Sequence, residues 1–257
     1  MKNNAEDPFR TDFPFGIIPS HYNWPGQFID QSYIGSYNAN VSFVHSSINV
    51  YNKSFYDISS FSPNMKSLID VTAQMDYLFV PSFNQSKDFL QCYMYTQSQF
   101  QRTYPATINY KNVYNYINYD GINDYWYVSS LSNPSTVSYT SPYYDQVAGQ
   151  LMITVSNTLN DPYNGNLIGA LGADLILKTF QNEIKKLTYL NKGRTILFEK
   201  DSGYVIADSE YNVTSLITYN SLKNLSISTN LWNELINNEH HLIYDKNNYF
   251  VSAFLDT

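Results

Sequence analysis

The most constraining feature of the sequence is a forty-residue block between Thr136 and Leu175. The run STVSYTSPYY predicts a strand, Gly149 predicts a turn, and the branched run LMITVSNTL predicts a second strand. Asp161-Pro162 and Asn164-Gly165 indicate a hairpin, after which LIGALGADL predicts the returning strand. This part of the chain is therefore expected to form an antiparallel sheet.

A helix is expected to follow this block, in ILKTFQNEIKKL. Its apolar residues recur at helical spacing on one face, at Ile176, Phe180, Ile184 and Leu187. Upstream, SPNMKSLIDVTAQMDYLFVPS predicts a helix that begins at Ser62-Pro63 and is closed by Pro81.

Two further regions frame that helix. Apolar residues recur loosely between residues 27 and 61, where a helix is the better interpretation, and residues 1–26 read as an irregular arm. The run FLQCYMYTQSQFQRTYPA alternates with a period of two and predicts two strands around a turn at residues 96–98, the second ending at Pro105.

A second, shorter unit is predicted after Asn191. GRTILFEKDSGYVIADSE predicts a strand, a turn and a strand, NLWNELINN a short helix, and HHLIYDKNNYFVSAFLD another hairpin. This order of elements predicts an α+β chain of two unequal modules with antiparallel sheets.

Composition narrows the classes of partner. The 257 residues carry a net charge of −7, and no cluster of Lys and Arg suits a nucleic acid. Only one cysteine is present, so a disulfide framework is excluded. No signal peptide and no apolar run of membrane-spanning length is visible, and the chain ends inside an apolar run, which favours a fragment of a longer protein.

Five sequons indicate an extracellular protein. The sequence N-x-[ST] occurs at Asn40, Asn52, Asn84, Asn212 and Asn224, and these are the candidate N-glycosylation sites.

Signals for catalysis are weak. No Gly-x-Ser-x-Gly motif occurs, the four histidines lack metal-ligand spacing, and GALGAD is too short for a dinucleotide loop. We therefore expect neither an enzyme nor a bound cofactor or metal.

Several runs together resemble the double-Cache family, extracellular sensor modules of membrane receptors. They are YMYTQSQFQRTYP, YWYVSS, TSPYYDQVAGQLMITVSNTLNDPYNGNLIGALGADL and TILFEKDSGYVIADS, in a match from about Ser62 to Thr257. The resemblance implies an α+β fold in which an N-terminal helical segment backs two PAS-like modules. It divides the chain into an arm and helix (1–61), a membrane-distal module with the ligand pocket (62–190) and a membrane-proximal module (191–257).

The amino-acid-sensing subgroup of that family implies a set of ligand-binding residues. The positions that hold a ligand's amine, or surround it with aromatic rings, fall on Tyr119, Trp126, Tyr127, Tyr143, Asp145 and Asp174. The position that holds a ligand's carboxylate with an arginine falls on Asp124, so its charge is reversed. An ammonium group can be bound by carboxylates and aromatic faces, and we therefore expect a cationic ligand that lacks a free carboxylate.

Structural roles compete with this interpretation. Asp124 follows turn residues and could cap a helix, Trp126 and Tyr127 could belong to a core, and Asp174 could cap the helix after its strand. The alternative function is an accessory or structural extracellular protein with a vestigial pocket. Calcium-channel alpha-two-delta subunits share the R-x-Y-P hairpin, seen here at Arg102, and a surface or filament scaffold is also open. The sequence leaves a homo-oligomer open as well.

Overall fold

The computed structural model describes residues 32–34, 39–43, 46–50, 62–85, 88–108, 120–134, 136–145, 148–161, 163–187, 194–200, 202–218, 230, 233, 242–245 and 248–251. The chain divides into two compact units, Met1–Thr179 and Phe180–Thr257.

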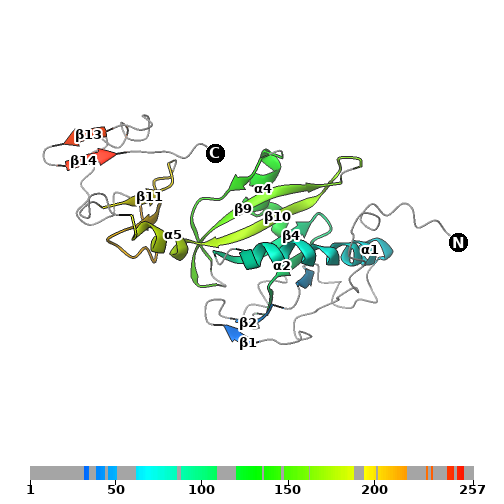
Figure 1. Cartoon of the computed structure of the whole chain (residues 1–257). Helices are drawn as coiled ribbons and strands as arrows, with labels where there is room; N and C mark the ends of the chain where they lie inside the picture. Colours follow the sequence, from blue (N-terminus) through cyan, green and yellow to red (C-terminus); the bar gives the residue numbers. More distant parts are fainter. Residues whose placement is uncertain are drawn as a thin grey trace. The chain divides into compact units, whose positions relative to one another are not determined.

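The first unit is built on a seven-stranded antiparallel sheet (Figure 1). Its order is β3 (Ser47–Val50), β5 (Phe100–Tyr104), β4 (Phe89–Thr96), β10 (Leu167–Ile176), β9 (Gln150–Asn160) and β7 (Ser138–Tyr139), with β8 (Tyr143–Asp145) also paired to β9. The predicted hairpins are confirmed. The strand expected at residues 135–144 is instead two short strands, β7 and β8, which pair with β9 at separate places.

The turns of this sheet have a clear local cause. Gly149 and Gly165 have φ angles of 66° and 73°, which side chains disfavour. At the β9–β10 turn, Asp161 accepts a hydrogen bond from the backbone N–H of Tyr163 at 2.8 Å. The turn residues identified in the sequence therefore fix the register of the central hairpin.

Two helices follow one another along one face of the sheet (Figure 1). They are α1 (Pro63–Thr72) and α2 (Asp76–Gln85), joined by the 3₁₀ turn η4 (Ala73–Met75). Ser62 caps α1 as predicted, because its hydroxyl accepts a hydrogen bond from the N–H of Met65 at 3.2 Å.

The predicted end of this helical segment at Pro81 is wrong. Pro81 lies inside α2, which continues to Gln85. The proline is on the exposed side, where a carbonyl that loses its helical partner remains close to water, while Phe79 packs into the core. Burial of the opposite side therefore outweighs the helix-breaking tendency of proline.

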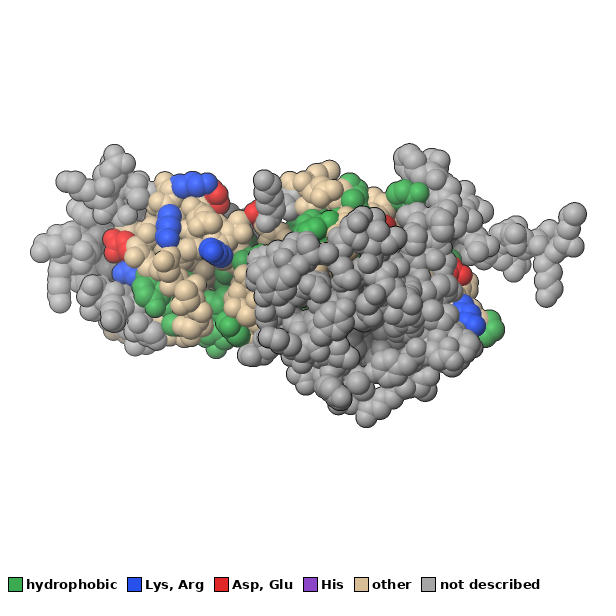
Figure 2. All heavy atoms as spheres, turned by 90° about the horizontal axis from the view of Figure 1, so that it is seen from below, with side chains coloured by type: hydrophobic (Ala, Val, Ile, Leu, Met, Phe, Trp, Pro, Cys, Tyr) green, Lys and Arg blue, Asp and Glu red, His purple; other side chains and the backbone are tan. Residues whose placement is uncertain are grey.

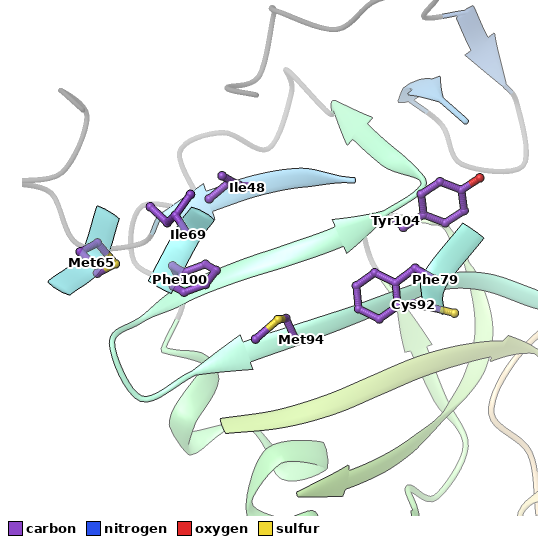
Figure 3. Packing of buried hydrophobic residues seen from close by; sticks show 8 residues of the cluster. All are labelled: Ile48, Met65, Ile69, Phe79, Cys92, Met94, Phe100 and Tyr104. Atoms are coloured by element: carbon purple, nitrogen blue, oxygen red, sulfur yellow. The ribbon is translucent and has the colours of Figure 1, made fainter. Parts of the chain in front are cut away.

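The core between these helices and the sheet is apolar (Figure 3). Strands β3, β4 and β5 contribute alternate residues, which point to one face because successive side chains of a strand alternate. The cluster consists of Ile48, Met65, Ile69, Phe79, Cys92, Met94, Phe100 and Tyr104.

Arg102 is buried beside this core and fully enclosed. Its guanidinium donates hydrogen bonds to the carbonyl of Ile69 (2.8 Å), the hydroxyl of Ser46 (3.0 Å) and the hydroxyl of Thr72 (3.3 Å). Burial lowers the pKa of Arg102 to about 10, against the opposing effect of Asp76 and Asp70. The R-x-Y-P arginine therefore joins β5 to the end of α1.

The helix predicted between residues 27 and 61 is wrong in the part that the structure describes. Residues there form β1 (Ser32–Ile34), β2 (Ala39–Ser42) and β3, and β1 and β2 make a three-stranded sheet with β6 (Ala106–Ile108). The short apolar runs are interrupted by Gly, Asn and Ser, and distant strands supply their hydrogen bonds. The α+β class is confirmed, but its N-terminal segment is not helical in the described residues.

The second unit contains short hairpins. Helix α5 (Leu177–Ile184) begins in the first unit and ends in the second. It is shorter than predicted at both ends, since Ile176 still belongs to β10 and the helix stops at Ile184, three residues before Leu187. The hairpins β11 (Ile196–Phe198) to β12 (Val205–Asp208) and β13 (Leu242–Asp245) to β14 (Asn248–Val251) are confirmed. The helix expected at residues 230–238 lies almost entirely outside the described residues.

A buried ion pair organises this second unit. Arg194 Nη2 lies 2.5 Å from Oδ2 of Asp208, whose side chain is fully buried. Gln181 of α5 accepts a hydrogen bond from the N–H of Asp208 at 3.2 Å. These contacts hold α5 against β12.

The described surface is sparsely charged. In Figure 2, uncharged side chains and backbone cover most of the described surface on the face that is shown. Within the described ranges, no helix combines the length and apolar character needed to cross a bilayer.

Candidate functional site

The candidate site lies on the sheet face opposite α1 and α2. The short helix α4 (Tyr125–Ser132), which follows the 3₁₀ turn η6 (Gly121–Asn123), packs against β9 and β10 on this face. The hydroxyl of Ser156 on β9 donates a 3.0 Å hydrogen bond to the carbonyl of Trp126. Helix α4 is thereby fixed to the sheet.

Asp124 begins this helix. Its Oδ1 accepts a hydrogen bond from the N–H of Tyr125 at 2.8 Å, and its carbonyl accepts one from Val128 at 3.0 Å. The capping role considered from the sequence is therefore present, and the turn residues 120–123 lead directly into the helix that contains Trp126.

Trp126 and Tyr127 are buried, at 5% and 2% exposure. Edge-to-face contacts join Trp126 to Tyr93 (ring centroids 5.0 Å apart) and Tyr127 to Tyr95 (5.9 Å). The two residues therefore form an aromatic core between α4 and the sheet, as the structural interpretation of the sequence expected.

Asp174 is the centre of the polar part of this face. It is 2% exposed, and its Oδ1 accepts hydrogen bonds from Thr154 Oγ1 at 2.7 Å and from the Tyr93 hydroxyl at 2.9 Å. The Tyr143 hydroxyl lies 3.4 Å from the same oxygen, and Gln91 Nε2 donates to Oδ2 at 2.6 Å. Because these side chains hold the carboxylate, Asp174 acts within the sheet and not as the cap of α5.

Burial raises the pKa of Asp174 to about 6. Hydrogen bonds from Gln91, Thr154 and Tyr93 oppose this rise, while the charge of Asp145 adds to it. The side chains that donate to Asp174 among the described residues are all neutral, so no lysine or arginine there neutralises the carboxylate.

Tyr143 lies beside Asp174, with 3.4 Å between its hydroxyl and Oδ1 of that carboxylate. Burial and the charges of Asp174, Asp145 and Asp124 raise the pKa of the Tyr143 hydroxyl, while its hydrogen bond with Thr154 lowers it. The structure thus brings together the predicted site residues Tyr143 and Asp174. Asp145 also has a local role, since its Oδ1 accepts a 2.6 Å hydrogen bond from Ala148 at the turn before β9.

Glycine at position 172 shapes the site. A Cβ at Gly172 would lie 2.4 Å from Cε2 of Tyr93, which is too short for two carbon atoms that are not bonded to each other. The absence of that atom lets the ring of Tyr93 lie over β10, where its hydroxyl reaches Asp174.

Sequence reasoning missed three residues of this polar cluster, namely Gln91, Tyr93 and Thr154. Two cross-strand pairs, Asp174 with Gln91 and Asp174 with Thr154, place them on one face. The alternation in β4 was a usable signal, because Gln91 and Tyr93 lie opposite the apolar Cys92 and Met94. The predicted Tyr119 lies outside the described residues.

The other predicted positions are spread over the chain. Asn84 and Asn212 are exposed, Asn40 lies in β2, and Asn52 and Asn224 are outside the described residues. Among the residues that the structure describes, no group of three or more His, Cys, Asp or Glu side chains is placed to hold a metal ion.

Comparison with known proteins identifies the class. Residues 37–182 match the family described as methyl-accepting chemotaxis protein-like, first PDC sensor domain. The match covers more than half of the chain, so the chain belongs to this family of sensor domains, and the predicted resemblance to a Cache-type sensor is confirmed.

Solved structures of chemoreceptor ligand-binding domains are similar to the chain. The Pseudomonas aeruginosa PAO1 amino acid chemoreceptor PctC, in complex with GABA, is 20% identical over 49% of this chain and 52% of that chain, with a TM-score of 0.38. The Pseudomonas fluorescens chemoreceptor CtaA, in complex with L-serine, is 21% identical over 50% and 53%, with a TM-score of 0.38. The Campylobacter jejuni chemoreceptor Tlp3, in complex with 4-methylisoleucine, is 19% identical over 76% and 69%, with a TM-score of 0.45. The chain spans about half the length of the first two.

Proposed function

We propose that this chain is the extracellular ligand-binding region of a membrane receptor and that it binds a small amine-bearing molecule. The ligand lies on the α4 side of the sheet in the distal module, residues 62–190, and residues 191–257 form the proximal module. Membership of a sensor-domain family supports binding rather than catalysis as the task of this site.

The observation that carries this proposal is the buried carboxylate of Asp174 with neutral donors. A carboxylate has about four lone-pair sites, two on each oxygen. Among the described residues, three hydroxyls lie within hydrogen-bond distance of Oδ1, while Oδ2 accepts from Gln91 alone. Oδ2 can therefore accept a further hydrogen bond from a ligand ammonium, in a charge-assisted contact stronger than a neutral one.

The surroundings of Asp174 suit a cation further. The negative charge of Asp145 acts on the carboxylate of Asp174, and a ligand ammonium would relieve this repulsion. The resemblance assigns Tyr119 to the ligand as well, where a cation–π contact would contribute roughly 0.5–2 kcal/mol. Trp126 and Tyr127 support the site by packing between α4 and the sheet.

Asp124 favours an amine over an ordinary amino acid. It occupies the position at which the resemblance places an arginine for a ligand carboxylate, and its negative charge would repel that group. The proposed ligands are accordingly monoamines, diamines or polyamines. The alternative, an accessory or scaffold protein with a vestigial pocket, predicts that no small amine binds.

Titration calorimetry with amines and with L-alanine tests this proposal. We expect an amine to bind the wild type, Asp174→Ala to abolish binding, and Asp174→Asn to weaken it at least tenfold while keeping the shape of the side chain. Glu183→Gln is the matched control, because it removes an exposed acid on α5. If L-alanine binds as tightly as any amine, the argument from the sign of Asp124 fails. If no amine binds, the alternative function is favoured.

A further inference from the structure

A row of directly opposed residues crosses the sheet beside Asp174. Ser47 of β3 is paired with Thr103 of β5, Thr103 with Tyr93 of β4, and Tyr93 with Gly172 of β10. Directly paired residues point to the same face of a sheet, so this row lies on the face that carries the site. The chain thus continues the polar surface from Asp174 toward the β3 edge.

The two hydroxyls at the end of this row are buried. Ser47 is 0% and Thr103 5% exposed, and neither hydroxyl has a hydrogen-bond partner among the residues that the structure describes. Opposed Ser and Thr side chains can bond to each other, but these two do not. Leaving a buried hydroxyl unpaired is unfavourable, and native proteins leave few such groups without a protein or water partner.

Tyr93 leans away from these hydroxyls. Its ring lies over Gly172 and its hydroxyl contacts Asp174, on the side of β4 opposite Thr103. Tyr93 therefore links the two ends of the row without satisfying the hydroxyl of Thr103.

The two ends of this polar surface, at Ser47 and Thr103 and at Asp174, differ in charge. The neighbouring Arg102 points to the other face, where it donates to the carbonyl of Ile69. The end at Ser47 and Thr103 therefore offers two neutral hydroxyls, while the other end offers the carboxylate of Asp174.

We propose that Ser47 and Thr103 form a second subsite, which hydrogen-bonds a neutral polar group of the ligand. This inference rests on the proposed function, since it places the ligand's ammonium at Asp174. Two strand spacings and two residues along a strand separate Thr103 from Asp174, or roughly 11–12 Å between Cα atoms. The ligand is accordingly an elongated amine with a hydroxyl or amide at its far end.

Matched pairs of ligands test the subsite. The probes are amino alcohols with four, five or six carbons, each compared with the alkylamine that lacks the hydroxyl, by titration calorimetry. We expect the wild type to prefer at least one amino alcohol by about fivefold or more, the effect of one hydrogen bond. Thr103→Val and Ser47→Ala should remove that preference and leave the alkylamine affinity unchanged, whereas Thr136→Val in an exposed turn should change neither.

The ligand-free protein provides a second readout. Replacing an unpaired buried hydroxyl by an apolar group of the same shape costs little, so Thr103→Val should melt no lower than the wild type. A clear fall in the melting temperature would show that the hydroxyl is already paired, and would overturn the subsite. Equal wild-type affinity for both members of every pair would overturn the subsite alone. Failure of all these amines to bind would overturn the proposed function as well.

Discussion

The ring of Tyr93 occupies the space that a side chain at Gly172 would need, and this contact aims its hydroxyl at a buried carboxylate. Glycine is unfavourable within a strand, because it has no side chain to pack and its backbone loses more conformational entropy on folding than that of other residues. Its presence here is explained by the close approach of the tyrosine.

Gly172→Ala should therefore destabilise the protein by about 1–3 kcal/mol, since the new methyl group forces Tyr93 to move. Chemical denaturation measures the loss. In a Tyr93→Ala background the same change should cost almost nothing, because the clashing ring is gone. Costs that simply add would contradict the contact described for these two residues.

The raised pKa of Asp174 predicts how stability depends on pH. The pKa is 3.8 for an ordinary aspartate and about 6 here, so the folded state binds a proton more readily than the unfolded state. The resulting stabilisation is full below about pH 3.8 and is lost as the pH rises through 6. Its size is of order 2–3 kcal/mol.

Comparison with Asp174→Asn isolates this effect. Between pH 4 and pH 7, the ligand-free wild type should lose stability relative to the variant, as measured by urea unfolding at each pH. A difference that stays constant across this range would show that the carboxylate titrates normally.

Substitutions at Asp124 should separate its two roles. Asn is as good an N-cap as Asp, so Asp124→Asn should preserve the melting temperature, whereas Asp124→Ala should lose about 1 kcal/mol. If the charge also attracts the ligand, both variants should weaken amine binding severalfold, most strongly at low salt. Unchanged affinity in Asp124→Asn would leave Asp124 with its capping role alone.

Arg102 should matter for stability but not for binding. Arg102→Met removes three hydrogen bonds and leaves Asp76 without its cation, so we expect a loss of about 3–5 kcal/mol in chemical denaturation. Arg102→Lys keeps the charge and should lose less. Amine affinity of the folded Lys variant should equal that of the wild type, because Arg102 lies on the other face of the sheet.

Local chemistry made much of the sheet predictable. Gly149, Gly165 and the alternation of β4 and β9 mark turns and strands within a few residues of sequence. The N-terminal strands were not predictable in this way, because β2 and β3 are short and pair with β6 and β5, which lie fifty or more positions away. The helix end predicted at Pro81 was wrong for a similar reason, because core packing on the other side of α2 keeps the segment helical beyond the proline.

The residues of the candidate site likewise divide into those that the sequence could predict and those that it could not. Asp174 and Tyr143 could be predicted because they belong to a motif that is continuous in sequence. Gln91, Tyr93 and Thr154 could not, because only the register of β4, β9 and β10 brings them to the carboxylate. Ser47 and Thr103 could not be predicted either, because serine and threonine are common residues. They stand out only because their hydroxyls are buried without a hydrogen-bond partner among the described residues.

Only Leu175 and Ile176 stand between Asp174 and Leu177, the residue at which α5 begins. The pairing of β10 with β4 also shifts register between Asp174 and Leu175, so the strand is already irregular at that point. If a ligand bound at Asp174 displaces the carboxylate, the displacement reaches α5 through only a few covalent bonds, and α5 is the helix by which the chain leaves the first unit. The end of β10 is therefore the place where ligand binding in the proposed sensor could change the position of α5.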